Sequence, residues 1–387
     1  MLKLSFIVLL LILLIGCNSD NPNIKTFEAE NISFNNVFEI EHFITIPLYQ
    51  KDTILSVSKL SVLGNGDIIV LDKYNTRIYL LDKQGLIKKT LCSKGQGPGE
   101  FNYISDYTTD FISNIYVISA LPKVSMINID KGFIKDFKLA FVHRYPQAIE
   151  FIGDKFLITA KKTLTDGSNK NDFRFLSYSN ECYLNLYNEE FELIKSFLGP
   201  HPSLENTLGR LANSFIPFVV ISHNESSILA ITKEGFYRMY EFDLETNLKN
   251  IYDLKSRNFV EIDLNETKEM RFNNNKWNMG IEKIGKIIAS HSYPIKLKIV
   301  SENVLIKNGM PFENIYPQFR TNFEERSYYD LIYYSSDKLI PKVENIKSDL
   351  DLVGTSGNFF IFAEAILEKS TEIKLYFCKV KDEYSKV

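Results

Sequence analysis

One glycine-rich stretch has residue types that can hold a phosphate group, GQGPGEF at residues 95–101. Phosphate-binding glycine loops place their backbone N–H groups at the start of a helix, where the helix dipole also favours an anion. Here Pro98 interrupts the loop and a strand pattern follows it, so no helix begins at this point. We therefore expect these glycines to allow a tight crossing between strands, because glycine tolerates backbone angles that other residues avoid.

Histidines and carboxylates could supply metal binding or acid–base catalysis, but none has the spacing of a known motif. The histidines stand far apart, and the sequence has no H-E-x-x-H, G-x-S-x-G or G-K-[ST] motif. Four carboxylates in long segments between strand patterns could pair as acid and base, although nothing in their spacing marks them as catalytic. We therefore predict no catalytic residue, no metal site and no cofactor. The residues considered are His42, His143, His201, His223, His291, Asp166, Asp172, Glu261 and Asp263.

The arginines are unevenly distributed along the sequence. Eight of the nine fall in segments between predicted strands, and only Arg238 falls within a strand. The planar donor fork of arginine suits carboxylate and phosphate groups. We therefore expect a subset to bind an anionic ligand, such as an acidic glycan or a carboxylate-bearing peptide. Trp277, the only tryptophan, either stacks on that ligand or anchors its own segment to the domain. The eight are Arg77, Arg257 and the six proposed ligand contacts, Arg144, Arg174, Arg210, Arg271, Arg320 and Arg326.

The amino terminus has the pattern of an exported lipoprotein. An apolar run at residues 4–15 is too short to span a bilayer but has the length of a signal-peptide core. The sequence Leu-Ile-Gly-Cys that ends at Cys17 resembles the bacterial lipoprotein box, in which the cysteine is acylated and becomes the new amino terminus. The alternative is an ordinary signal peptide that ends near a cysteine. We predict a signal peptide at residues 1–16, a lipid-anchored tether at 17–33 and a folded domain at 34–387.

Charge and cysteine content restrict the partners. Without residues 1–16 the chain has 44 basic and 48 acidic side chains, so it lacks the basic excess that nucleic acids or acidic membranes attract. We expect no nucleic-acid partner, and contact with the membrane through the lipid at Cys17. The remaining cysteines, Cys92, Cys182 and Cys378, lack the spacing of a disulfide framework or a zinc site. Whether any two of them form a disulfide bond stays open.

A repeated strand pattern must position all these side chains. Six copies of a strand pattern rich in Ile, Val and Phe each follow an apolar run and precede two further strands around a short turn. Six units of four strands predict an all-β fold, a six-bladed β-propeller of antiparallel blades. The six copies are at residues 66–72, 113–119, 153–160, 225–232, 301–308 and 356–364.

The two ends of the chain are expected to meet. The sixth unit is short, and residues 38–48 (FEIEHFITIPL) form a strand pattern that has no unit of its own. We predict that this strand is the outer strand of the last blade, where it closes the ring and covers an exposed edge.

Long insertions are expected on one face only. In a four-stranded antiparallel blade, the connection from the second strand to the third and the connection to the next blade emerge on the same face. All the long segments are of these two kinds, and loop-rich faces of this sort usually carry binding sites. The segments are residues 161–180, 199–214, 255–293 and 308–327.

GQGPGEF, joined to a D-K-Q-G hairpin, resembles the turn that links neighbouring blades in NHL-repeat propellers. Together with the lipoprotein signal, the chain looks more like the TolB-like six-bladed propeller lipoproteins of Gram-negative gut bacteria. The resemblance implies an outer-membrane lipid anchor, on the periplasmic or the external side, and supplies no catalytic residues. We expect a binding or scaffolding module for a glycan, a peptide or an outer-membrane protein complex. The alternative is a lyase or lactonase-like hydrolase with a metal in the central channel.

Overall fold

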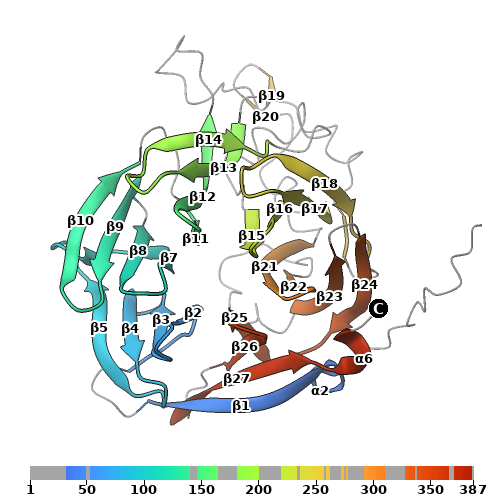
Figure 1. Cartoon of the computed structure of the whole chain (residues 1–387), viewed down its shortest axis with the longest axis horizontal. Coiled ribbons are helices and arrows are strands. Elements are labelled where there is room, and N and C mark those ends of the chain that lie inside the picture. Colours follow the sequence, from blue (N-terminus) through green and yellow to red (C-terminus); the bar gives the residue numbers. More distant parts are fainter. Residues whose placement is uncertain are drawn as a thin grey trace, which may run out of the picture. The chain divides into compact units, whose positions relative to one another are not determined.

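Strands dominate the described chain, as the alternation of apolar and polar residues predicts (Figure 1). The described helices, α2 (Phe34–Val37) and α6 (Asp382–Ser385), are short, and neither has the length and hydropathy needed to cross a membrane. The computed structural model describes residues 32–48, 53–119, 121–139, 146–163, 181–199, 219–232, 236–256, 259–261, 272–273, 276–277, 292–309, 327–335, 338–365 and 370–385.

Six antiparallel sheets, each with four main strands, form a ring, which confirms the predicted six-bladed propeller (Figure 1). The four strands of each blade lie side by side, in order from the middle of the ring to its rim. Blade one contains β2 (Lys59–Val62), β3 (Ile68–Asp72), β4 (Arg77–Leu81) and β5 (Ile87–Lys94); blade two contains β7 (Ile104–Thr109), β8 (Asn114–Ser119), β9 (Lys123–Asn128) and β10 (Gly132–Lys138). Blade three contains β11 (Ala148–Ile152), β12 (Lys155–Thr163), β13 (Glu181–Tyr187) and β14 (Leu193–Phe197).

The remaining blades follow in chain order, and the last takes one strand from the amino-terminal end of the described chain. Blade four contains β15 (Val219–His223), β16 (Ile228–Thr232), β17 (Arg238–Phe242) and β18 (Leu248–Asp253); blade five contains β21 (Tyr293–Val300), β22 (Asn303–Gly309), β23 (Ser327–Ser335) and β24 (Lys338–Ile346). Blade six contains β25 (Leu350–Ser356), β26 (Phe359–Glu364), β27 (Glu372–Val380) and β1 (Phe38–Pro47).

The core lies between the blades. The second strands β3 and β16 are buried along their whole length, because a neighbouring blade covers each of their faces. The outer strands β5 and β18 alternate between covered and exposed residues, because one of their faces meets water. Six apolar clusters of described residues result, one at each interface between adjacent blades.

The predicted closure of the ring is confirmed. β1 pairs with β27 in antiparallel register from Phe38 opposite Val380 to Pro47 opposite Glu372. The strand ends one residue earlier than the predicted segment at 38–48. Blade six also packs closely on blade one, since a Cβ added to Gly354 would lie 2.4 Å from the carbonyl oxygen of Leu60. Both ends of the described chain therefore contribute to the same blade.

The four predicted insertions have the expected places in the strand order. Strands β12 and β13 flank one, and β22 and β23 flank another. The other two connect β14 to β15 and β18 to β21, from one blade to the next. Most of these insertions lie outside the described residues, but the last contains a two-stranded hairpin of β19 (Phe272–Asn273) and β20 (Lys276–Trp277).

Candidate functional site

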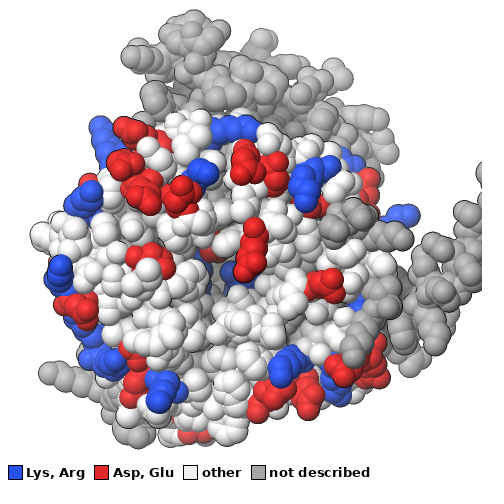
Figure 2. Space-filling model, in the orientation of Figure 1, with Lys and Arg blue, Asp and Glu red and all other residues white. Residues whose placement is uncertain are grey.

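A cavity of about 720 Å³ lies in the middle of the ring, between the inner strands of the blades. All six blades contribute to its lining. Figure 2 shows a hollow at the centre of the ring, with basic side chains visible in it. Its volume is in the range of pockets that bind small molecules. The cavity is therefore the candidate functional site.

Strand direction places the charged part of this cavity towards one face. Lys59 is the first residue of β2, Asp351 is the second residue of β25, and Lys73 directly follows β3. Inner strands begin, and second strands end, at the face where the connections to third strands and to following blades emerge. This is the face at which all four long insertions begin and end.

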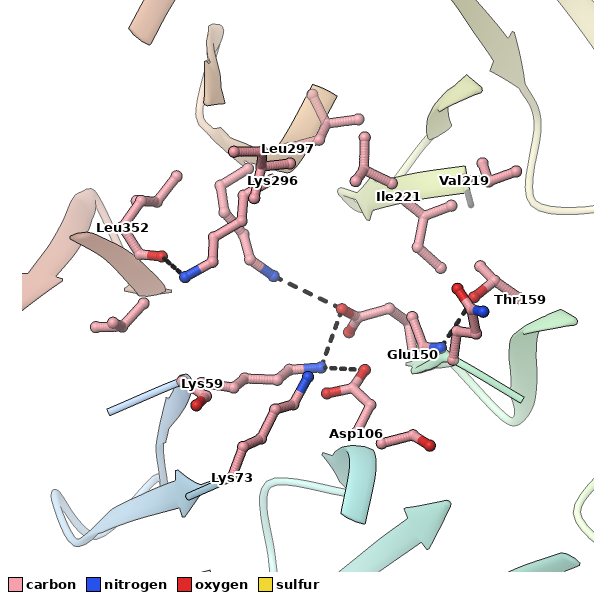
Figure 3. Close-up of a pocket in the computed structure, with 18 of the residues that line it drawn as sticks. Lys59, Lys73, Asp106, Glu150, Thr159, Val219, Ile221, Lys296, Leu297 and Leu352 are labelled. Carbon is pink, nitrogen blue, oxygen red and sulfur yellow. Dashed lines mark hydrogen bonds and ion pairs between the residues drawn. The ribbon is translucent and has the colours of Figure 1, made fainter. Parts of the chain in front are cut away.

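Lys59 connects the first three blades through ion pairs. Its Nζ lies 3.1 Å from Oδ2 of Asp106 on β7 and 3.3 Å from Oε1 of Glu150 on β11 (Figure 3). Asp106 also accepts a hydrogen bond from the backbone N–H of Ile149, at 3.0 Å. Burial opposes the charged form of Lys59, but the carboxylates of Asp106 and Glu150 outweigh it and raise the pKa of the ammonium group above its usual range.

Glu150 also reaches the opposite side of the ring. Its Oε1 lies 3.6 Å from Nζ of Lys298 on β21, in blade five. Burial alone would raise the pKa of Glu150, but the charges of Lys59 and Lys298 lower it to about 2. Glu150 is therefore an anion at neutral pH, and its Oε1 lies beside both lysines.

A second group of ion pairs joins blades five and six. Lys296 on β21 donates to Oδ2 of Asp351 at 2.9 Å and to the carbonyl oxygen of Leu352 at 2.7 Å. Lys307 on β22 donates to the other carboxylate oxygen of Asp351 at 3.0 Å. Burial favours the neutral carboxyl of Asp351, but the two lysines hold its pKa below the usual range. One carboxylate thus serves two lysines.

Among the described lysines of the cavity, Lys73 belongs to neither of these groups of ion pairs. It lines the cavity beside Lys59, and its side chain makes no hydrogen bond or ion pair with any residue that the structure describes (Figure 3). The side chain is exposed to the cavity, but protein surrounds the cavity. This burial lowers the pKa of Lys73, the Asp106 carboxylate raises it in part, and Lys59 lowers it further. An anion beside Lys73 would offset the repulsion between the ammonium groups of Lys59 and Lys73.

A hydrogen-bonded turn fixes the backbone at Lys73. The buried carboxylate of Asp72 accepts backbone hydrogen bonds from Tyr74 and Asn75, both at 3.1 Å, and from Leu55 at 2.8 Å. Such a turn, built on an aspartate side chain, restricts the backbone on both sides of Lys73. The cation is therefore presented by a rigid element of blade one.

In and beside the cavity, five lysines face three carboxylates among the described residues. This leaves an excess of two positive charges, although the chain as a whole is acidic. The lysines are Lys59, Lys73, Lys296, Lys298 and Lys307, and the carboxylates are Asp106, Glu150 and Asp351.

The arginines predicted to bind a ligand lie outside the described residues, as does Cys17, so these predictions stay untested. Trp277 is described only as a backbone position in β20, opposite Phe272. The prediction that Arg77 falls between strands is wrong, because Arg77 is the first residue of β4, and its guanidinium lies 3.4 Å from the hydroxyl of Tyr79. The residues outside the description are Arg144, Arg174, Arg210, Arg257, Arg271, Arg320 and Arg326.

The described histidines lie apart from one another. His42 stacks on Phe377 at the outer edge of blade six, with ring centroids 4.3 Å apart. His223 ends β15, and burial lowers its pKa, although Glu150 partly raises it. Of the four carboxylates considered, Glu261 is described and accepts a hydrogen bond from the backbone of Tyr237 at 3.4 Å. Within the described residues no three His, Cys, Asp or Glu side chains are grouped as metal ligands would be.

The glycine-rich stretch connects blade one to blade two, as expected. It contains a short strand, β6 (Glu100–Phe101), parallel to the end of β5. The backbone N–H of Gly97 donates to Oε2 of Glu100 at 2.9 Å, so the loop holds a carboxylate of its own. Buried Cys92, Cys182 and Cys378 form no disulfide bond within the described part of the chain.

The lysine-lined cavity was not predicted from the sequence. Its charged residues are scattered singly from position 59 to position 351, and only the closed ring brings them together. One signal was present, because Lys296 and Lys298 alternate with apolar residues in a strand that faces the centre of the ring. In a propeller, the side chains of an inner strand meet water only in the central channel.

The comparisons with known proteins agree with this architecture. The family model described as "DUF5128: 6-bladed beta-propeller" matches residues 17–361. A solved structure of a Bacteroides fragilis protein described as exported aligns at a TM-score of 0.64 and 14% identity, over 92% of this chain and 98% of that one. A member of the DUF4221 family from Bacteroides vulgatus aligns at 0.61 and 12% identity, over 89% and 98%. No curated protein matches this chain.

Proposed function

The chain belongs to the DUF5128 family of six-bladed β-propellers, and from this premise we propose that it is a binding module of the bacterial cell envelope whose central cavity takes an anionic ligand. The observation that carries the proposal is the position of Lys73. This ammonium group faces the cavity on a fixed turn and lacks a partner among the described residues. An anion is the ligand that would neutralise it.

The surrounding ion pairs support the choice of Lys73 as the contact. Lys59 and Lys298 share the carboxylate of Glu150, and Lys296 and Lys307 share that of Asp351. These four lysines are held in place and supply a positive field, while Lys73 keeps donors for a ligand. Because the ion pairs already order these four side chains, ligand binding carries no further cost of ordering them.

The position of the cavity links this site to the predicted arginines. The charged part of the cavity lies towards the face where the long insertions begin and end, and those insertions contain five of the six proposed arginine contacts, all except Arg144. We infer that these arginines attract an anionic ligand and that Lys73 binds its charged group. An acidic glycan, a carboxylate-bearing peptide or an acidic segment of an outer-membrane protein complex would satisfy these contacts.

The location of the protein at the outer membrane is part of the same proposal. The lipoprotein box at Cys17 and the tether at residues 17–33 would hold the propeller at the outer membrane, as in the TolB-like lipoproteins that the chain resembles.

Binding measurements on the full-length chain in lipid nanodiscs test the proposal. We expect small carboxylates to bind, with affinity that falls as salt rises, because mobile ions screen exposed charges. Lys73→Met should weaken binding roughly 10- to 100-fold, the range for loss of a hydrogen bond to a charged group. Lys83→Met, at an exposed turn of the same blade, is the matched control and should change nothing. Anion binding that is equal in both variants would refute the role of Lys73.

A further inference from the structure

The walls of the central cavity differ in polarity, and from this difference we propose that its ligand is an amphipathic carboxylate, with an apolar body as well as a charged head. The inference rests on the proposed function and specifies the class of ligand. The charged head would lie at Lys73 in blade one. The apolar body would lie against β15, the inner strand of blade four, on the other side of the cavity (Figure 3).

The apolar wall is continuous along one inner strand. β15 contributes three consecutive lining residues, Val219, Val220 and Ile221, whereas β21 contributes Ile295 and Leu297 in alternation with Lys296 and Lys298. Val220 and Ile295 are half-buried, so part of each side chain remains in contact with the cavity. Water against this surface is unfavourable, and a hydrocarbon body would displace it.

The polar wall has the opposite character. Blades one to three contribute Lys59, Lys73, Asp106 and Glu150, and all of these except Lys73 are engaged with one another or with blade five. A sugar would need hydrogen-bond partners around most of its ring. The wall formed by β15 offers only the side chains of valine and isoleucine. An amphipathic carboxylate matches both walls, because it needs one cation at one end and apolar contact along the rest.

Calorimetric titration of the full-length chain in nanodiscs separates these classes, with empty nanodiscs as the blank for partitioning. The probes are hexanoate, octanoate, octan-1-ol and glucuronate. Octanoate should bind more tightly than hexanoate, by up to about fourfold for each added methylene that becomes buried. Octanol, which lacks the charge, and glucuronate, which lacks the apolar body, should both bind more weakly than octanoate.

Two matched variants locate the two ends of the ligand. Val220→Thr keeps the shape of the side chain but replaces a methyl group with a hydroxyl group, and it should lower the affinity for octanoate several-fold. Val62→Thr makes the same change on an inner strand outside the lining and should leave the affinity unchanged. Lys73→Met should abolish the preference for octanoate over octanol. Thermal unfolding of each variant shows whether it is folded.

The possible results distinguish the two proposals. Octanoate binding that depends on chain length, Val220 and Lys73 supports the amphipathic ligand. Glucuronate binding at least as tight as octanoate binding, with no effect of chain length, overturns the amphipathic ligand and leaves the anionic cavity standing. Failure of every anion to bind overturns the proposed function itself.

Discussion

Glu150 and Lys298 form an ion pair across the central cavity, with 3.6 Å between the carboxylate oxygen and the ammonium nitrogen. The two residues belong to blades three and five, which are not neighbours in the ring. The same oxygen lies 3.3 Å from Nζ of Lys59 in blade one. A single carboxylate therefore ties three inner strands together around the site.

Replacing this carboxylate should destabilise the whole ring. Glu150→Gln leaves Lys59 and Lys298 close together in a mostly buried position, and removal of one partner from a buried ion pair typically costs about 3–5 kcal/mol. Chemical denaturation measures the loss in the free energy of unfolding. The matched control is Glu41→Gln on β1, which removes the exposed pair with Lys379 on β27 and should cost less than about 1 kcal/mol. Equal effects of the two substitutions would contradict the central role of Glu150.

The stability of the chain should fall in acid within a definite window. The pKa of Glu150 is about 2 in the folded chain and ordinarily 4.5, so the folded state holds this carboxylate charged more strongly than the unfolded state does. Its contribution is present above pH 4.5 and is lost as the pH falls towards 2. Denaturation from neutral pH to pH 2 measures this loss. In Glu150→Gln the pH dependence should become shallower, and an unchanged slope would show that other groups account for it.

The contact between Gly354 and Leu60 should tolerate no side chain. A methyl group at Gly354 would lie 2.4 Å from the backbone carbonyl oxygen of Leu60, and neither backbone can move without separating blade six from blade one. Gly354→Ala should destabilise the chain by about 1–3 kcal/mol or more, as overpacking does. Gly64→Ala, where the nearest atom would be 3.9 Å away, is the control, and thermal unfolding compares the two variants. An unaltered melting temperature of Gly354→Ala would show that the blades separate easily.

The strands were predictable because their signal is local. Alternating apolar and polar residues repeat in all six units, and β1 was recognised as the closing strand because its pattern had no unit of its own. The site was not predictable in the same way. Lys73 follows a strand like any turn lysine, and what distinguishes it is that no carboxylate of the described residues forms an ion pair with its ammonium group. That depends on how Asp106 and Glu150 are shared with Lys59, which no spacing in the sequence encodes.

Membrane attachment should depend on Cys17. The short apolar core and the Leu-Ile-Gly-Cys sequence predict acylation of this cysteine. Cys17→Ala should therefore release the protein from the membrane fraction, and immunoblots after fractionation would follow it. Cys92→Ala is the control, because this buried cysteine lies within blade one and should leave attachment unchanged. A Cys17→Ala protein that stays with the membranes after a high-salt wash would show that the lipoprotein prediction is wrong.

The arginines of the insertions should add affinity by their fork as well as by their charge. Arginine binds carboxylates through two parallel hydrogen bonds, which lysine cannot reproduce. We expect Arg174→Lys or Arg320→Lys to weaken the binding of an anionic glycan or peptide, and Arg174→Ala or Arg320→Ala to weaken it further. Arg238→Lys is the control, because Arg238 is on β17 and pairs with Asp253 at 2.5 Å. Array binding that all the insertion variants leave unchanged would assign these arginines to neighbouring acids, and the cavity lysines alone would then have to account for any anion binding.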